Sequence, residues 1–503
     1  MEMRRMPPFR EKISIFSGAS VMVSLIVAVL SWTFFTPPFS AVDGPAHISA
    51  AYASVHGQLV ADTNIHQPKG YVTSIKVPNW IFPIQASEGP YCFWGKREIS
   101  ASCANNNWND STIQERPNQY AQYFPTYSVI AGIPSLFTSG KTAYYLMSIS
   151  GALLFFVMCW IYFVSCVRRG KPKQILGIFV ILTPMSISGA GMLAPLSLET
   201  IAAACFLSLL INRLREEQSD NPFKKIDTYL LTFSLFVLLT SRPSGVLWVF
   251  FAFIFAVPFI NGNYLDLIKR EVALMSTAGF LILFDLVYLY FHRAETGSNP
   301  LVGSFSILNF LSFEFQKLGE LFNNAVGIFG MDVYLPSVFY YLFAGIIFSV
   351  LVLVFSSNEV EKKIKTIVGI GIVAVVILPM IVAFIYRYDL VGFWQGRYIN
   401  PLLGMLMLIS IIAIEKNTLV FAFSLISLGA SLIGILIAFW RYSFGISTSC
   451  CYLFTKVNSP NVWQFGGFNT TWLLMFGAIS FLAFISAGYF LLCKQNNQRQ
   501  LNV

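Results

Sequence analysis

The sequence predicts an all-α protein that crosses a membrane many times. Hydrophobic residues make up 56% of the 503 positions and charged residues only 11%, whereas soluble domains carry about 25% charged residues. Apolar runs of about 20 residues, long enough to cross a hydrocarbon core as α-helices, recur along the chain. Groups of Lys and Arg separate many of these runs, as in loops retained in the cytoplasm. We therefore expect one membrane-embedded domain over residues 1–503.

The basic groups determine the expected topology. Cytoplasmic Lys and Arg occur within residues 4–12, 168–173, 213–225, 269–270, 362–365 and 494–499. Crossings placed between them give about 12 helices, with both termini in the cytoplasm. The expected spans cover residues 13–35, 142–167, 174–193, 196–211, 229–241, 245–260, 272–291, 335–355, 367–385, 399–414, 419–440 and 472–492. Two prolines interrupt the apolar segment 120–137, so a thirteenth crossing stays open.

Two further features of the sequence bear on its class. The first apolar run is long and lacks a small-x-small cleavage site, so we expect a membrane anchor and not a removed signal peptide. The net charge of +9 is explained mostly by the positive-inside bias. No nucleic-acid partner is therefore expected.

The longest loops are expected on the outer side of the membrane, over residues 36–119, 292–334 and 441–471. The first is far longer than a joint between two helices requires, and such loops commonly carry function. It contains Cys92 and Cys103, whereas Cys450 and Cys451 lie in the last loop. In an oxidising exterior we prefer a Cys92–Cys103 disulfide, with a bridge to the last loop as the alternative.

The stretch PPFSAVDGPAH, residues 37–47, places a carboxylate directly after the first span. Asp43 can cap a juxtamembrane helix that begins at Gly44 and Pro45 and lies along the membrane surface. From the same turn Asp43 can also take a proton from a polar acceptor, while a lipid-linked donor lies in the bilayer. His47 can orient Asp43, bind the acceptor, or be an ordinary interfacial side chain.

Other polar residues fall at the outer ends of expected spans. Glu199 in LAPLSLET and Arg242 in SRPSG are functional candidates, although snorkelling or a mutual ion pair is the alternative. Arginine forks suit phosphate, and aromatic rings suit a sugar face or an isoprenoid chain. The short outer loop YRYDLVGFWQGRYINP contains both kinds, with Arg387, Gln395, Arg397 and Tyr398 as candidates.

Five motifs taken in order carry a family resemblance. PPFSAVDGPAH, LAPLSLET, SRPSG, GMDVYLP and WQGRYINPLL together resemble a bacterial family of membrane proteins, domain-of-unknown-function family 2142, within the GT-C superfamily of membrane glycosyltransferases. The resemblance implies a GT-C fold, in which the first outer loop holds a catalytic acid. It also implies a sugar donor carried on polyprenyl phosphate, and a bacterial plasma membrane location with the active site outside.

The resemblance carries over residue by residue. Asp43 matches the family's acid, while Asp332 and Arg397 match directly. Glu199 stands where the family usually has aspartate, and Arg242 where a lysine precedes proline. Gly44 replaces a second acid. Because a single carboxylate holds a divalent cation poorly, Mg or Mn is expected only if Glu199 or Asp332 completes a site. No cofactor is certain.

The expected activity is inverting transfer of a sugar from a polyprenyl-phosphate donor to a glycan, lipid or protein acceptor. Asp43 would act as general base, with Glu199 as a second catalytic residue. Arginines would stabilise the leaving phosphate, and further residues would contact substrate. The residues expected to bind the donor phosphate are Arg397, Arg242 and Arg387. The residues expected to contact substrate are His47, Asp332, Gln395 and Tyr398. A flippase, another transporter or a polymerase of lipid-linked saccharides is the alternative; charges clustered at outer helix ends and the large first loop favour the transferase.

Overall fold

The computed structural model describes residues 8–59, 62–67, 70–81, 92–104, 107–118, 120, 123–169, 171–215, 224–260, 272–292, 307–330, 332–386, 395–414, 416–445 and 470–492. Most of these residues are helical. Eight helices among them are long and apolar enough to cross a membrane. They are α1 (Pro8–Phe35), α4 (Gly140–Arg168), α7 (Pro195–Arg215), α13 (Ser337–Ser356), α14 (Lys362–Tyr386), η7 with α15 (Gly396–Ile399, Asn400–Ile414), α16 (Asn417–Phe444) and α17 (Thr470–Leu492).

Further helices contain shorter apolar segments, of 10–17 residues. They are α3 with η4 (Thr126–Gly132, Ile133–Leu136), α8 (Lys224–Ser241), α9 with η6 (Gly245–Ala256, Val257–Phe259) and α11 (Val272–His292). Every span expected from the sequence overlaps a helix. The multi-pass class is therefore supported, while the number of crossings, 12 or 13, stays a prediction.

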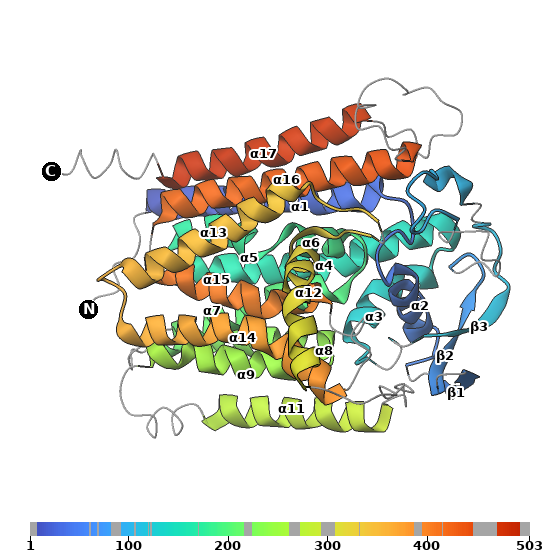
Figure 1. The fold of residues 1–503 in the computed structure, drawn as a ribbon, viewed down its shortest axis with the longest axis horizontal. Helices are drawn as coiled ribbons and strands as arrows, with labels where there is room; N and C mark the ends of the chain where they lie inside the picture. Colours follow the sequence, from blue (N-terminus) through green and yellow to red (C-terminus); the bar gives the residue numbers. More distant parts are fainter. Residues whose placement is uncertain are drawn as a thin grey trace.

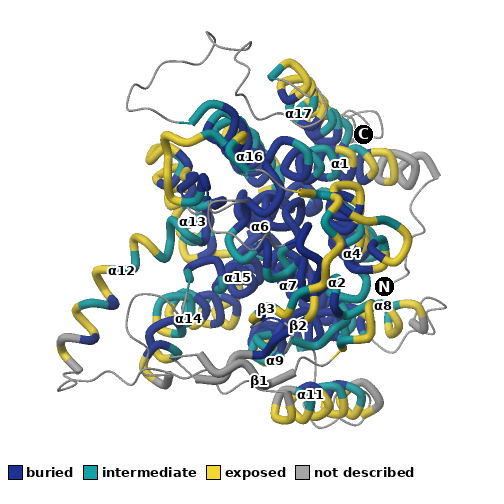
Figure 2. Tube along the Cα trace, turned by 90° about the vertical axis from the view of Figure 1, so that its right-hand side faces the viewer, coloured by how far each residue is buried: buried dark blue, intermediate teal, exposed yellow. Residues whose placement is uncertain are grey.

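The segment expected as one helix over residues 174–193 is broken. It forms η5 (Pro172–Gly177), α5 (Ile178–Ile181) and α6 (Pro184–Gly191), with a bend of 84° before α6. Proline disfavours the helical conformation in the residue before it. Thr183 is accordingly extended, and its side chain caps α6 by accepting from the Ser186 backbone N–H. The break places α6 in the centre of the bundle, where all its residues are buried (Figure 2).

The segment between α1 and α3 contains both helices and strands. Helix α2 (Gly44–Val55) follows α1, and three antiparallel strands pair in the order β1 (Asp62–Gln67), β2 (Gly70–Pro78), β3 (Ile113–Pro117). This sheet was not expected from the sequence. The short helix η2 is Ala101–Cys103, and Cys92 and Cys103 form a disulfide, the preferred pairing. Figure 1 shows α2, α3 and the sheet together at one end of the bundle, opposite the start of α1 and the end of α17.

Helix α12 (Ile307–Gly327) lies crosswise to the spanning helices (Figure 1). It falls in the expected outer loop 292–334, where no helix was foreseen. Its C-terminal turn is buried, at Ala325, Val326 and Gly327, whereas Leu308 and Phe315 are exposed. Its buried end contacts η7 and α6. Helix α12 therefore packs against η7 and α6 and helps to position them.

Candidate functional site

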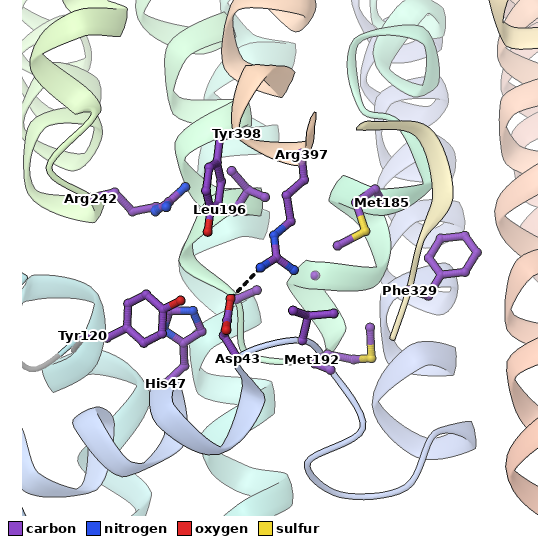
Figure 3. Close-up of a pocket in the computed structure, with 14 residues that line it drawn as sticks. Asp43, His47, Tyr120, Met185, Met192, Leu196, Arg242, Phe329, Arg397 and Tyr398 are labelled. Atoms are coloured by element: carbon purple, nitrogen blue, oxygen red, sulfur yellow. Dashed lines mark hydrogen bonds and ion pairs between the residues drawn. The ribbon is translucent and has the colours of Figure 1, made fainter. Parts of the chain in front are cut away.

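A narrow cavity lies where several helices end beside α2 (Figure 3). Its volume is about 20 Å³, room for about one water molecule. Apolar side chains form most of its wall, and charged and aromatic groups face one another across it. The lining residues are Ala41, Val42, Asp43, His47, Tyr120, Met185, Gly189, Met192, Ala194, Leu196, Arg242, Phe329, Arg397 and Tyr398.

Asp43 begins helix α2, but its carboxylate does not cap that helix. Its backbone is left-handed, at φ 64° and ψ 4°, a conformation that Asp tolerates better than most residues. The Asp43 carbonyl accepts from the backbone N–H groups of Ala46 and His47, both at 3.0 Å. The side chain makes no capping hydrogen bond. Instead, Oδ2 accepts from Arg397 Nη2 at 2.5 Å, which joins positions 354 residues apart.

Close backbone packing positions Arg397. A Cβ atom on Gly396 would lie 1.6 Å from the carbonyl oxygen of Leu321 in α12, so this approach requires glycine. Asn400 follows Arg397 by three residues, and its Nδ2 donates to the Ala325 carbonyl at 3.0 Å and to Thr183 Oγ1 at 3.2 Å. These contacts fix η7 between α12 and α6. The Arg397 side chain then reaches inward and is only 7% exposed.

Arg242, between α8 and α9, forms the second charged pair. Its Nη1 lies 3.3 Å from Oε2 of Glu199, which is completely buried in α7. The other carboxylate oxygen, Oε1, accepts from Ser244 Oγ at 2.6 Å and from Trp248 Nε1 at 2.8 Å. The Arg242 guanidinium also lies 4.5 Å from the centre of the Tyr398 ring. Glu199 therefore holds Arg242 in place and is not among the cavity-lining residues.

Two tyrosines at this site were not predicted from the sequence. The Tyr120 hydroxyl interacts with the Asp43 carboxylate, and the Tyr123 hydroxyl with Arg242. The sequence NQYAQYFP gives only a weak signal, namely tyrosines next to a proline-interrupted apolar segment at a membrane boundary. Burial raises the pKa of both phenols; Asp43 adds to this effect at Tyr120, whereas Arg242 opposes it at Tyr123. Both tyrosines therefore stay protonated, and Tyr120 can donate to Asp43.

His47 lies in the same wall, with its ring 4.3 Å from that of Tyr120. Burial lowers the pKa of His47 to about 3, and the Arg242 and Arg397 guanidinium groups add to this against the opposing effect of Asp43. His47 is therefore neutral at physiological pH. A neutral imidazole can both donate and accept a hydrogen bond.

Asp332 and Arg441 form a separate buried pair. Arg441, at the end of α16, is completely buried and donates to Asp332 Oδ2 from Nε at 2.8 Å and from Nη2 at 2.7 Å. It also donates to the carbonyls of Phe93, Lys96 and Ile99 in the disulfide-closed loop. Asp332 does not line the cavity. Arg441 was missed from the sequence because it resembles an ordinary basic residue at a helix end.

Three expected site residues remain, and each has a different outcome. Tyr398 lines the cavity, whereas Gln395 is half-buried and does not line it. Arg387 lies outside the described residues. Among the residues that are described, no three His, Cys, Asp or Glu side chains are close enough to share a metal ion. Glu199 and Asp332 each pair with their own arginine, so neither completes a metal site with Asp43 in this structure.

The comparisons with known proteins identify a family but no activity. No curated protein and no solved structure is significantly similar to the chain. A family model described as a predicted membrane protein, DUF2142, matches residues 25–407. That range contains the Asp43–Arg397 and Glu199–Arg242 pairs. The chain therefore belongs to the DUF2142 family of membrane proteins.

Proposed function

We propose that this protein is a membrane glycosyltransferase of the GT-C type. It would transfer a sugar from a polyprenyl-phosphate donor to a glycan, lipid or protein acceptor outside a bacterial plasma membrane. One observation carries the proposal: Asp43 meets Arg397 in a cavity that also contains Arg242 and Tyr398, at the end of the bundle with the large outer loop. One carboxylate, two guanidinium groups and aromatic faces are what a sugar phosphate requires.

The reaction would proceed by direct displacement at the anomeric carbon. Asp43 accepts the proton of an acceptor hydroxyl, whose oxygen forms a bond to that carbon. The bond between the anomeric carbon and the phosphate oxygen breaks, and polyprenyl phosphate leaves with the electron pair. The configuration at the anomeric carbon is inverted by this single displacement.

Charge develops on the leaving phosphate as the bond breaks. The guanidinium groups of Arg397 and Arg242 both lie near the Tyr398 ring, at 5.5 and 4.5 Å from its centre. Cations already positioned in a site that excludes water stabilise such charge with little reorganisation. The proposed role of both arginines is to bind the donor phosphate, while neutral His47 hydrogen-bonds an acceptor or sugar hydroxyl.

For Glu199 we propose a role other than the catalytic one expected from the sequence. Both of its oxygens are occupied, by Arg242, Ser244 and Trp248. We assign it to the positioning of Arg242. Roles for Gln395 and Asp332 in substrate binding stay predictions from the sequence.

The test is sugar transfer by the purified protein from a panel of radiolabelled polyprenyl-phosphate sugars, with and without a chelator. Wild type should consume one donor, and Arg397→Ala should lose most of the activity. Glu359→Gln, which removes an exposed carboxylate between α13 and α14, serves as control. If no donor is consumed, and wild-type vesicles instead move a lipid-linked saccharide across the bilayer, the transporter alternative replaces the proposal. The chelator arm tests metal dependence.

A further inference from the structure

The cavity is too small for the substrate that the proposed function requires. Its volume of about 20 Å³ accommodates about one water, whereas the proposed donor carries a sugar, a phosphate and an isoprenoid chain. Figure 3 shows the Asp43–Arg397 pair extending across this space. A ligand can therefore enter only if groups at the pair move apart.

The surroundings indicate which of the two ion pairs, Arg242–Glu199 or Arg397–Asp43, separates when a ligand enters. Arg242 is tied to a fully buried carboxylate that does not line the cavity, so a phosphate can approach Arg242 without displacing Glu199. Arg397 differs, because its carboxylate partner itself lines the cavity. The backbone of η7 is fixed by Gly396 and Asn400, whereas the side chains of Arg397 and Asp43 can rotate. Asp43 is also the more exposed of the two, at 24% against 7%.

Resting on the proposed function, we propose that the donor phosphate displaces Asp43 from Arg397, so that the base is released only once the donor is bound. Carboxylate and phosphate use the same N–H edges of a guanidinium group and repel each other when close. While Asp43 is paired with Arg397, its Oδ2 accepts the arginine N–H at 2.5 Å, and this hydrogen bond occupies the position that an acceptor hydroxyl would need. After the exchange, this oxygen can accept a hydrogen bond from the acceptor hydroxyl. The donor therefore binds before the acceptor.

Tyr120 is the positioning residue in this exchange. It is 7% exposed, interacts with Asp43 through its hydroxyl, and packs against His47 and Tyr123. When Arg397 turns to the phosphate, the Tyr120 hydroxyl remains beside Asp43 and can donate to it. The carboxylate then keeps its orientation toward the acceptor without a cation beside it.

The test is equilibrium binding of sugar-free polyprenyl monophosphate to wild type, Asp43→Asn, Arg397→Ala and the double variant. In wild type, binding must break a charge-assisted hydrogen bond, so Asp43→Asn should bind about tenfold more tightly. In the Arg397→Ala background, Asp43→Asn should change the affinity less than about twofold. Glu359→Gln is the matched acid-to-amide control and should bind like wild type. If Asp43→Asn does not fold, Asp43→Ser replaces it with the same expectation.

The outcomes separate the exchange from plain charge repulsion. Equal tightening in both Arg397 backgrounds, or no tightening at all, would overturn the exchange. Tyr120→Phe supplies a second readout: binding of polyprenyl phosphate should stay within about twofold of wild type, while transfer at saturating donor falls about tenfold. Tyr341→Phe, at an exposed position on α13, is its control. A Tyr120→Phe variant with full transfer would contradict the positioning role.

The same measurements distinguish this inference from the proposed function. Tighter binding by Asp43→Asn in a protein that transfers no sugar would support the exchange at Arg397 and contradict the transferase. Sugar transfer by wild type without any tightening in Asp43→Asn would support the transferase and contradict the exchange. If neither wild type nor Asp43→Asn binds polyprenyl phosphate, the exchange and the transferase are both contradicted.

Discussion

Replacing Glu199 by glutamine tests whether this residue positions Arg242 or takes part in the chemistry. Glu199 is completely buried and Arg242 is 8% exposed. Removing one charge of a buried pair costs about 3–5 kcal/mol, because the other charge is left uncompensated. A glutamine oxygen can still accept from Ser244 and Trp248, so we expect a loss of about 3 kcal/mol in the free energy of unfolding. Transfer should fall, since Arg242 is mispositioned, but it should not vanish.

The assay is equilibrium unfolding in mixed detergent micelles, combined with the rate of sugar transfer. The double variant Glu199→Gln/Arg242→Gln removes both charges and should be less destabilised than the sum of the single variants, by about 1–3 kcal/mol. Unchanged stability of Glu199→Gln together with abolished transfer would refute this reasoning, because Glu199 would then be catalytic. Strict additivity in the double variant would refute it as well.

Three further predictions concern other parts of the molecule. Asp332→Asn leaves Arg441 buried without its anion, and should lower the free energy of unfolding by about 3 kcal/mol in the same assay. The pKa of His47 is about 3 in the folded protein and 6.5 in the unfolded chain, so the unfolded chain binds the proton first as the pH falls. The free energy of unfolding of wild type should therefore decrease below about pH 6.5, by up to about 1.4 kcal/mol per pH unit. In His47→Gln the free energy of unfolding should depend less on pH. Gly396→Ala places a methyl group on the Leu321 carbonyl, and should lower transfer through weaker donor binding. Each prediction is contradicted if its variant has the same stability, pH profile or transfer rate as wild type.

The spanning helices could be predicted because their signal is local. Each needs only a long apolar run, and basic residues mark where the runs end. The break before α6 also has a local cause, in Pro184, but an apolar run alone does not reveal it. The sheet after α2 could not be foreseen, because β3 has only five residues and its side chains alternate only between exposed and half-buried.

The candidate site was predictable in its residues but not in its pairing. Asp43, Arg242 and Arg397 were singled out as charges at outer helix ends, and all three line the cavity. That Arg397 pairs with Asp43 and Arg242 with Glu199 depends on how distant helices pack. The same holds for Asp332, which meets Arg441 and not the cavity. Tyr120 was missed because an aromatic residue near a membrane boundary is ordinary in such sequences.

The most direct test of the central claim is the rate of sugar transfer by Asp43→Asn at saturating donor. The variant keeps the shape of the side chain and removes its ability to accept a proton. We predict that transfer falls by about 10²–10⁴-fold, the usual contribution of a general base, in a protein that remains folded and still binds the donor. Transfer at the wild-type rate by this variant would contradict the account.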